Sequence, residues 1–444
     1  MCIRDRLVPS GIATDATTSG FFRKLVDERR LAELIDFENK GIFPDIHSSF
    51  KFSIIVMAGS SDPQSHVRAG FFLHGIDELE NPKRCMDLSP DDFILFNPNT
   101  ATSPIFRRRR DYELTRNIYE RVPVLLDKGR HEAGNPWGIR FQQGLFNMTS
   151  DSHLFRTAAE LEADGCWRDG RDAGNVYRGK EGRWLPLYEA KMIHQFDHRF
   201  ANGVAGDERL ISGQASASLS AAQKADLSYS AMPRYWVPES EVRFDSSVML
   251  GFRDIARATD VRTFIAALIP RCGVGHTMPL IMARGGRLDL LLANLNALVF
   301  DFTTRQKISS THLTFFIVEQ LPVLPPATYD DDFHGARLAD FISQRVLELS
   351  YTAHDMRGLA DDLGYDGPPF AWDEVRRLHL RCQLDALYFI LYGLNRDEAA
   401  EVLDTFPIVK RQDEARWGTF RTRDLILAYM GAYAAGAMDA QVNG

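Results

Sequence analysis

Three kinds of feature are missing from this chain of 444 residues. It has no run of eighteen apolar residues, the length that a membrane-spanning helix needs. No apolar stretch follows the charges of its N-terminus, so no secretory signal is recognised. Its five cysteines show neither the paired spacing of a zinc site nor an even disulfide framework: Cys2, Cys85, Cys166, Cys272 and Cys382. These absences predict a protein of the reducing cytoplasm with no membrane partner.

Negative charge is concentrated near the C-terminus. The net charge is −8, and the residues from Pro325 onward alone include 20 acidic and 12 basic side chains. Residues 181–324 are nearly neutral, with 15 basic and 14 acidic side chains. Because the sign of a local patch governs phosphate contact, this middle part can still present a basic groove. A hydrophobic content of 45% is sufficient for globular cores, and about two to four domains are expected at this length.

The stretch Leu185–Phe200, LPLYEAKMIHQFDHRF, has the highest density of hydrogen-bonding side chains interleaved with apolar ones. Its pattern predicts one strand running into one helix, with the apolar set buried and the polar set facing outward. Lysine, histidine, glutamine and arginine are donors that reach phosphates and base edges, so the polar set is a candidate recognition surface. If the stretch has no binding function, its polar set is simply the solvated face of a helix.

Two catalytic alternatives apply to the same stretch. His194 and His198 stand four apart, as in zinc helices, but Gln195 occupies the place of the glutamate that zinc chemistry requires. Glu189 and Lys191 form a Glu-x-Lys pattern of magnesium nucleases, with Asp172 upstream as a second candidate ligand. Magnesium is expected only under this nuclease alternative.

Further arginines are candidates for DNA contact. The run Arg107–Arg110 is either a phosphate clamp, which we favour, or the solvated start of a helix over residues 111–122. Two strands are expected over residues 250–255 and 262–270, with arginines at their edges. Bidentate arginine is a common reader of guanine and a phosphate ligand, although each of these arginines has Asp254 or Asp260 as an alternative partner.

The remaining pattern predicts alternating strands and helices. A buried strand ends at residues 7–10, followed by an amphipathic helix over 14–30 with Phe21, Phe22, Leu25 and Val26 inward, and by strands over 31–37 and 50–57. Residues 288–326 predict one long apolar helix, a basic turn and a strand with a proline-rich exit. Helices are expected over residues 376–394 and 396–405.

Four segments carry a family resemblance. VPSGIATD at residues 8–15 and LIDFENKGIFPDIHSSFKFSIIVM at residues 34–57 resemble the last part of the catalytic domain of N6-adenine DNA methyltransferases of type IIG-like and phage-defence restriction–modification systems. In that family the final two strands of the sheet form an antiparallel pair. Residues 288–326 resemble the end of the family's target-recognition domains, and FPIVKRQDEARWGTFRTRDLILAYM at residues 406–430 resembles its C-terminal cap.

The resemblance implies an α/β fold class: a partial Rossmann-like methyltransferase sheet within residues 7–150, a mixed α/β target-recognition domain over 151–326, and a helical C-terminal tail over 327–444. The implied reaction transfers a methyl group from S-adenosylmethionine to the exocyclic amine of a flipped adenine. The implied partners are double-stranded DNA and other subunits of the restriction–modification system.

The sequence departs from the family at its chemical centre. It contains no glycine-rich cofactor turn at its start and no Asp/Asn/Ser-Pro-Pro-Tyr/Phe tetrapeptide. In Asp366–Phe370 the residue before the two prolines is Gly367, which has no side chain to bind the target amine, and Gly273–Gly275 does not follow a hydrophobic strand. We therefore expect a fragment that lacks the cofactor-binding half and does not methylate alone.

We expect the chain to read or position the duplex instead, with Lys191, Arg253, Arg271 and Lys307 along one concave, positively charged trough. A separate DNA-binding specificity subunit would share these features. The full set of candidate DNA-binding residues is Arg107, Arg108, Lys191, His194, Gln195, Arg199, Arg234, Arg253, Arg262, Arg271, His276, Arg305 and Lys307.

Overall fold

The computed structural model of the chain describes residues 4–48, 50–168, 173–180, 182–203, 217–309 and 311–442. The chain divides into two compact units. Unit 1 consists of Met1–Pro136, Phe302–Leu324 and Tyr392–Glu398, and unit 2 of Trp137–Asp301, Pro325–Leu391 and Ala399–Gly444. The mixed α/β class is confirmed, while the expected division into three domains stays a prediction. Within the described ranges, no helix is both long enough and apolar enough to cross a membrane.

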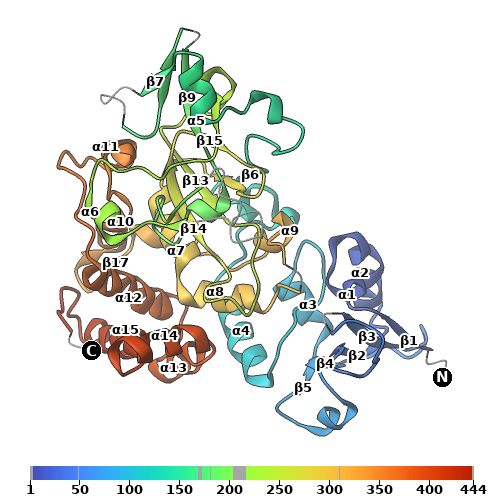
Figure 1. Cartoon of the computed structure of the whole chain (residues 1–444). Coiled ribbons are helices and arrows are strands. Elements are labelled where there is room, and N and C mark those ends of the chain that lie inside the picture. The colour runs from blue at the N-terminus through green and yellow to red at the C-terminus, as the bar shows by residue number, and fades with distance from the viewer. Residues whose placement is uncertain are drawn as a thin grey trace. The chain divides into compact units, whose positions relative to one another are not determined.

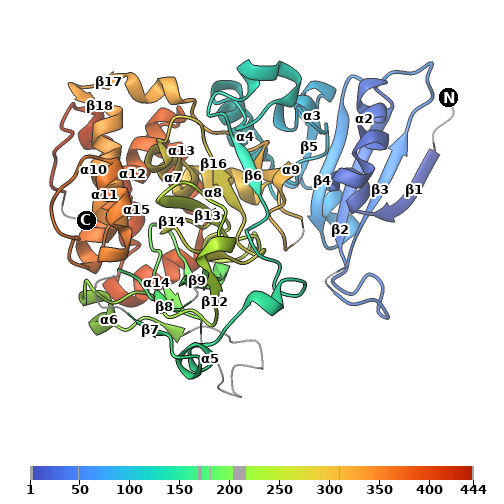
Figure 2. The same cartoon turned by 90° about the horizontal axis from the view of Figure 1, so that it is seen from above.

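Unit 1 is built on a five-stranded mixed sheet (Figure 2). Its order is β1-β3-β2-β4-β5, with bounds β1 Arg4–Pro9, β2 Leu31–Glu38, β3 Lys51–Met57, β4 Val67–Leu73 and β5 Cys85–Leu88. Strand β3 is antiparallel to both β1 and β2, β2 is parallel to β4, and β4 is antiparallel to β5. The two strands predicted over residues 31–37 and 50–57 are therefore confirmed.

One amphipathic helix of unit 1 is shorter than its pattern predicts. Helix α2 covers Ser19–Asp27 and follows the short helix α1, Gly11–Thr14. Phe22, Leu25 and Val26 are buried, as predicted, but Phe21 is 48% exposed. Leu7 in β1 is also 58% exposed, so the expectation of a buried strand there is wrong. Strand β1 pairs with β3 alone among the described strands, which leaves its other edge open.

The other helices of unit 1 are α3, Pro90–Phe96, α4, Arg109–Arg121, and α9, Phe315–Val318. Helix α3 begins at a capping box in which the Ser89 hydroxyl accepts the Asp92 N–H and the Asp92 carboxylate accepts the Ser89 N–H. Helix α4 confirms the prediction over residues 111–122. A helix, α9, stands where a strand was predicted before the proline-rich exit, so that prediction is wrong.

Unit 2 contains two main sheets (Figure 1). The first has the order β12-β9-β8-β7, with β15 parallel to β9; the bounds are β7 Trp167–Arg168, β8 Tyr177–Gly179, β9 Gly182–Tyr188, β12 Trp236–Pro238 and β15 Gly273–Val274. The second has the order β14-β13-β16-β6, with β6 Arg140–Gln142, β13 Val248–Phe252, β14 Ala266–Pro270 and β16 Leu280–Met282. Strands β13 and β14 confirm the expected pair, with shorter bounds.

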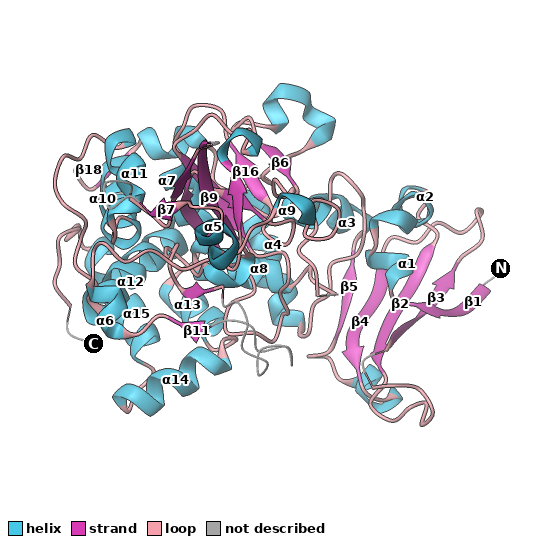
Figure 3. Cartoon of the chain, turned by 45° about the horizontal axis from the view of Figure 1, so that its top comes forward, coloured by secondary structure: helices cyan, strands magenta, loops and turns pink. Residues whose placement is uncertain are grey.

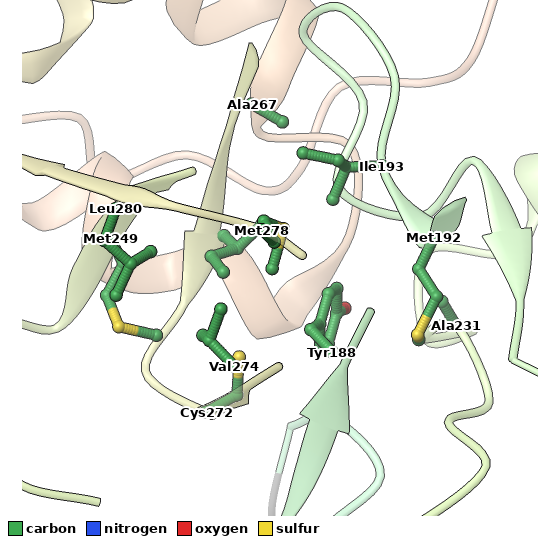
Figure 4. Packing of buried hydrophobic residues seen from close by; sticks show 11 residues of the cluster. Tyr188, Met192, Ile193, Ala231, Met249, Ala267, Cys272, Val274, Met278 and Leu280 are labelled. Atoms are coloured by element: carbon green, nitrogen blue, oxygen red, sulfur yellow. The ribbon is translucent and has the colours of Figure 1, made fainter. Parts of the chain in front are cut away.

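A buried cluster connects these sheets (Figure 4). Tyr188 at the end of β9 packs with Met192 and Ile193 from the following turn, Val274 from β15, and Met249 from β13. Small paired strands complete the β structure of unit 2: β10 Ala201–Asn202 with β11 Ala217–Ser218, and β17 Asp332–Phe333 with β18 Ala336–Arg337. The cluster fixes the end of β9 on a rigid apolar base.

The C-terminal part is helical, as predicted (Figure 3). Helix α12 packs against α10 and α15. The long helix expected from residue 288 is two helices, α7 and α8, because Ala297 has extended backbone angles, φ −65° and ψ 144°. Helix α12 ends before Gly393, whose φ is +77°, so that predicted end is confirmed. The remaining bounds are α5 Ala158–Ala163, α6 Ala221–Ala225, α7 Leu288–Asn296, α8 Leu298–Arg305, α10 Leu338–Ser350, α11 Arg357–Asp362, α12 Glu374–Leu391, α13 Arg396–Leu403, α14 Pro407–Trp417 and α15 Arg421–Ala434.

Candidate nucleic-acid interface

The stretch Leu185–Phe200 begins as predicted and then departs from its pattern. Strand β9 ends at Tyr188, and a single 3-10 turn, η5 Ala190–Met192, follows in place of the expected helix. The chain then turns back: Phe196 has a φ of +55°, a left-handed conformation that an α-helix does not contain. The Phe196 N–H donates to the Ala266 carbonyl of β14, which ties the turn to the second sheet.

Most polar side chains of this stretch face inward, against the prediction of an outward recognition face. Both Asp197 carboxylate oxygens accept from Lys224 Nζ at 2.7 Å, in the interior of unit 2. Burial alone would raise the pKa of Asp197, but Lys224 and Arg377 bring it below its usual value. Burial lowers the pKa of Lys224 to about 8. The polar residues of this stretch are thus part of a buried charged network.

Arg199 lies at the centre of that network and is fully buried. Its guanidinium donates to five backbone carbonyls, those of Gln223, Lys224, Asp226, Tyr229 and Thr352. Carbonyl oxygens from two distant parts of the chain therefore share one cation. A side chain with no exposed surface cannot touch a duplex, and we withdraw Arg199 from the DNA contacts.

The two catalytic alternatives find little support in this stretch. His198 Nε2 lies 2.9 Å from Asp355 Oδ1, and the His194 ring packs on Phe200. Glu189 is ion-paired with Lys191 at 3.1 Å. Among the residues that the structure describes, no group of three or more His, Cys, Asp or Glu could hold a metal ion, and Asp172 lies outside the described residues.

One set of predicted residues does come together, at the end of β9. Strand β15 runs parallel to β9 with Val274 opposite Tyr188, so the residues that follow the two strands, Lys191 and His276, lie at the same end. Strand β12 runs antiparallel to β9, and the Leu187 N–H donates to the Tyr235 carbonyl, which places Arg234 at this end too. We call Lys191, Arg234, His276 and Gln143 the β9-end cluster.

Gln143 is the member of the cluster that sequence reasoning missed. It follows β6, far from β9 in the sequence, and its side-chain amide donates to the His276 carbonyl at 2.7 Å. The His276 Nδ1 in turn accepts the Met148 N–H at 3.2 Å. Gln143 and Arg234 are exposed, while Lys191 and His276 are partly exposed. The cluster offers amide, imidazole, ammonium and guanidinium groups, which suit phosphates and base edges.

Four other candidates in unit 2 are bound within the protein. Arg253 donates to the Ile193 carbonyl, and Arg271 pairs with Glu239 at 2.8 Å. Arg262 is buried and pairs with Asp301 at 2.8 Å. Asp260, one of the expected alternative partners, acts electrostatically on Arg253. Gln195 is buried and donates to the Asn296 carbonyl.

In unit 1 the contacts of the run Arg107–Arg110 fit the start of a helix better than a phosphate clamp. Arg108 pairs with Asp111 at 2.6 Å, directly before α4, and Arg109 and Arg110 each lie 3.4 Å from Glu113. Arg107 is exposed and covers the ring of Phe72 at 4.0 Å. Arg305 is half-buried in α8.

Lys307 is a buried cation of unit 1, so its predicted phosphate contact is wrong for this conformation. Its ammonium donates to the Phe96 carbonyl, to Asn97 Oδ1 at 2.8 Å and to the Gln320 carbonyl. Burial brings its pKa well below the usual value. Arg253, Arg271 and Lys307 are thus bonded within the protein, and Lys191 is ion-paired with Glu189. The four side chains therefore do not present the free cationic groups that the expected trough requires.

No protein-family model and no curated protein matches the chain. Among solved structures, the chain is similar to the type IIG restriction endonuclease BpuSI, with a TM-score of 0.29 and 13% identity over 87% of this chain and 47% of that one. It is also similar to the type IIL restriction-modification enzyme MmeI in complex with DNA, with a TM-score of 0.42 and 10% identity over 92% and 50% of the two chains. The chain thus spans about half the length of these structures. Similarities of this size do not establish a shared function.

Proposed function

We propose that this chain supplies DNA target recognition to a site-specific adenine-N6 DNA methyltransferase of a restriction–modification or phage-defence system. The observation that carries the proposal is the sheet of unit 1. The resemblance at residues 8–57 implies a sheet whose last two strands are antiparallel, and β2 and β3 pair in that way over Leu31–Glu38 and Lys51–Met57. Strand β1 lies on the other side of β3, so both adjacent strands run opposite to β3.

The proposed DNA contact is the β9-end cluster of unit 2. Its members come from four separate segments, and Lys191 and His276 follow strands whose ends, at Tyr188 and Val274, belong to the buried cluster (Figure 4). Lys191 and Arg234 would meet phosphates, because an ammonium and an exposed guanidinium are effective counter-ions of the DNA backbone. Gln143 and His276 would face base edges or sugars, where the side-chain amide of Gln143 and the Nε2 side of the His276 ring can form hydrogen bonds.

The residues of this chain do not fit the methyl donor. Gly273 is packed inside the β sheet: a Cβ added there would lie 2.6 Å from Val237 Cγ2, so this glycine serves strand packing. Asp366–Phe370 keeps Gly367 in the place of the catalytic side chain. We therefore assign S-adenosylmethionine and the flipped adenine to other residues, on the same polypeptide or on a partner subunit.

The absence of a catalytic tetrapeptide from the 444 residues also favours a second candidate, a specificity subunit that works with a separate methyltransferase. The two candidates differ in whether one polypeptide or two are needed for methylation. Purified native complexes would distinguish them by the number of chains that copurify with methylating activity.

The experiment that tests the proposal is genome-wide mapping of N6-methyladenine in the host. Deleting the gene should remove methylation from one DNA motif, and restoring the gene should bring it back. The double variant Lys191→Ala, Arg234→Ala should restore it poorly, whereas the exposed control Lys24→Ala should restore it fully. Unchanged adenine methylation after deletion would contradict the proposal.

A further inference from the structure

Unit 2 contains a cavity of about 280 Å³ between the turn at His194, the end of α7 and the helices α12 and α14. This volume is close to about 300 Å³, the lower end of the range usual for small-molecule sites, which suits a small ligand such as a nucleoside monophosphate. Every wall residue belongs to unit 2, and none belongs to the β9-end cluster.

Two arginines line the cavity without an ion pair to an acidic side chain, although Arg381 acts electrostatically on the neighbouring Asp385. No hydrogen bond or ion pair joins Arg381 of α12 to another described residue, and its side chain is partly exposed. Arg416 of α14 is exposed and lies over the ring of Trp417, 4.8 Å from its centroid. Arg262, by contrast, is already paired with Asp301. Arg381 and Arg416 are therefore available to a bound anion.

The acidic residues of the walls are engaged with the protein. Asp385 accepts the Leu298 N–H at 2.6 Å, and Asp413 accepts the Thr422 N–H at 2.6 Å. Glu374 accepts from Trp372 Nε1 at 2.8 Å. Burial raises the pKa of Asp385 to about 6, which weakens its repulsion of an anion in mildly acidic solution.

The remaining walls suit a planar ring. Trp417 is half-buried and presents an indole, and aromatic stacking on a nucleobase is worth about 1–3 kcal/mol. Across the turn, burial and Arg253 lower the pKa of His194 to about 3, so its imidazole is neutral. A neutral imidazole both donates and accepts hydrogen bonds, as the polar edge of a base requires.

We propose that this cavity binds a nucleoside monophosphate, with the phosphate on Arg381 and Arg416 and the base against Trp417. The proposal uses none of the residues assigned to DNA contact, so it stands or falls independently of the proposed function. The cavity is partly open to solvent, so a free nucleotide can enter it.

The test is calorimetric titration of the full chain with AMP, adenosine and inorganic phosphate in turn. AMP should bind saturably and more tightly than either of its parts. Arg381→Ala should weaken AMP binding about tenfold or more, since it removes a charge-assisted contact to phosphate. Arg411→Ala, on the exposed side of α14 and outside the cavity, is the matched control and should leave AMP affinity unchanged.

A second readout separates loss of binding from loss of folding. AMP should quench tryptophan fluorescence in the wild type and in Arg411→Ala, and Trp417→Phe should lose this quench while keeping its thermal unfolding midpoint. Equal affinity for AMP and inorganic phosphate would overturn the base assignment, and equal affinity for AMP and adenosine would overturn the phosphate assignment. Absence of AMP binding up to millimolar concentration by the folded wild type would overturn the site itself.

Discussion

His198 and Asp355, 157 residues apart in the sequence, form a buried pair in unit 2 with Nε2 2.9 Å from Oδ1. The pair joins the turn after β9 to the segment before α11. Burial alone would raise the pKa of Asp355, but His198, Ser230 and Arg199 stabilise its carboxylate and lower that pKa below its usual value. Stability thus depends on a charge that sequence patterns place at the surface.

The first prediction concerns acid stability. The pKa of Asp355 is lower in the folded state than in the unfolded state. The contribution of Asp355 to folding stability is therefore fully present above the unfolded-state pKa and is lost as the pH falls through the folded-state pKa. Asp355→Asn should reduce the free energy of unfolding by about 3 kcal/mol or more at pH 7, because it removes the buried carboxylate that interacts with His198 and Arg199. Urea unfolding should show that the difference in unfolding free energy between wild type and Asp355→Asn is smaller at pH 3 than at pH 7. An equal difference at both pH values would exclude this role.

The second prediction has the opposite sign and concerns Asp385. Burial raises its pKa to about 6, so the folded protein holds a proton that the unfolded chain releases above its ordinary pKa near 4. Its contribution to stability is therefore full below pH 4 and is lost as pH rises through 6. The free energy of unfolding of Asp385→Asn, taken relative to that of wild type, should rise by about 3 kcal/mol between pH 4 and pH 7. The exposed control Asp164→Asn should show no such change, and a flat difference for Asp385→Asn would refute the prediction.

The third prediction separates stability from DNA binding at Lys307. Lys307→Ala should destabilise unit 1 by about 3 kcal/mol, because the carbonyls of Phe96 and Gln320 and the amide oxygen of Asn97 lose a buried donor. The salt dependence of duplex binding by the folded variant should equal that of wild type. Chemical unfolding and anisotropy titrations measure the two quantities. A reduced salt slope would return Lys307 to the DNA contacts.

The sequence predicts local elements well where one face is clearly apolar. The strands over residues 31–37 and 50–57 and the helices α4, α12 and α13 lie where the apolar spacing predicts them, and α12 ends before Gly393. Pairing order is not local information: nothing in the spacing shows that β3 lies between β1 and β2. Only the family resemblance pointed to an antiparallel pair.

The candidate site was less predictable, because hydropathy assigns charged side chains to the surface. Asp197, His198 and Arg199 are buried because partners from residues 224–229 and 352–355 neutralise them, and those partners are remote in the sequence. Gln143 was missed because a lone glutamine carries no signal until β6 brings it beside His276. Arg381 and Trp417 lie on different helices, so their shared cavity has no sequence signature.

The most direct test of the account is the salt dependence of duplex binding by the β9-end cluster, measured by fluorescence anisotropy of a labelled DNA between 50 and about 200 mM salt. Lys191→Ala and Arg234→Ala should each reduce the slope of log affinity against log salt by about 0.9, and the double variant by about twice that, while Lys24→Ala leaves it unchanged. If both cluster variants keep the wild-type slope while remaining folded, the cluster does not contact DNA and the proposed interface is wrong.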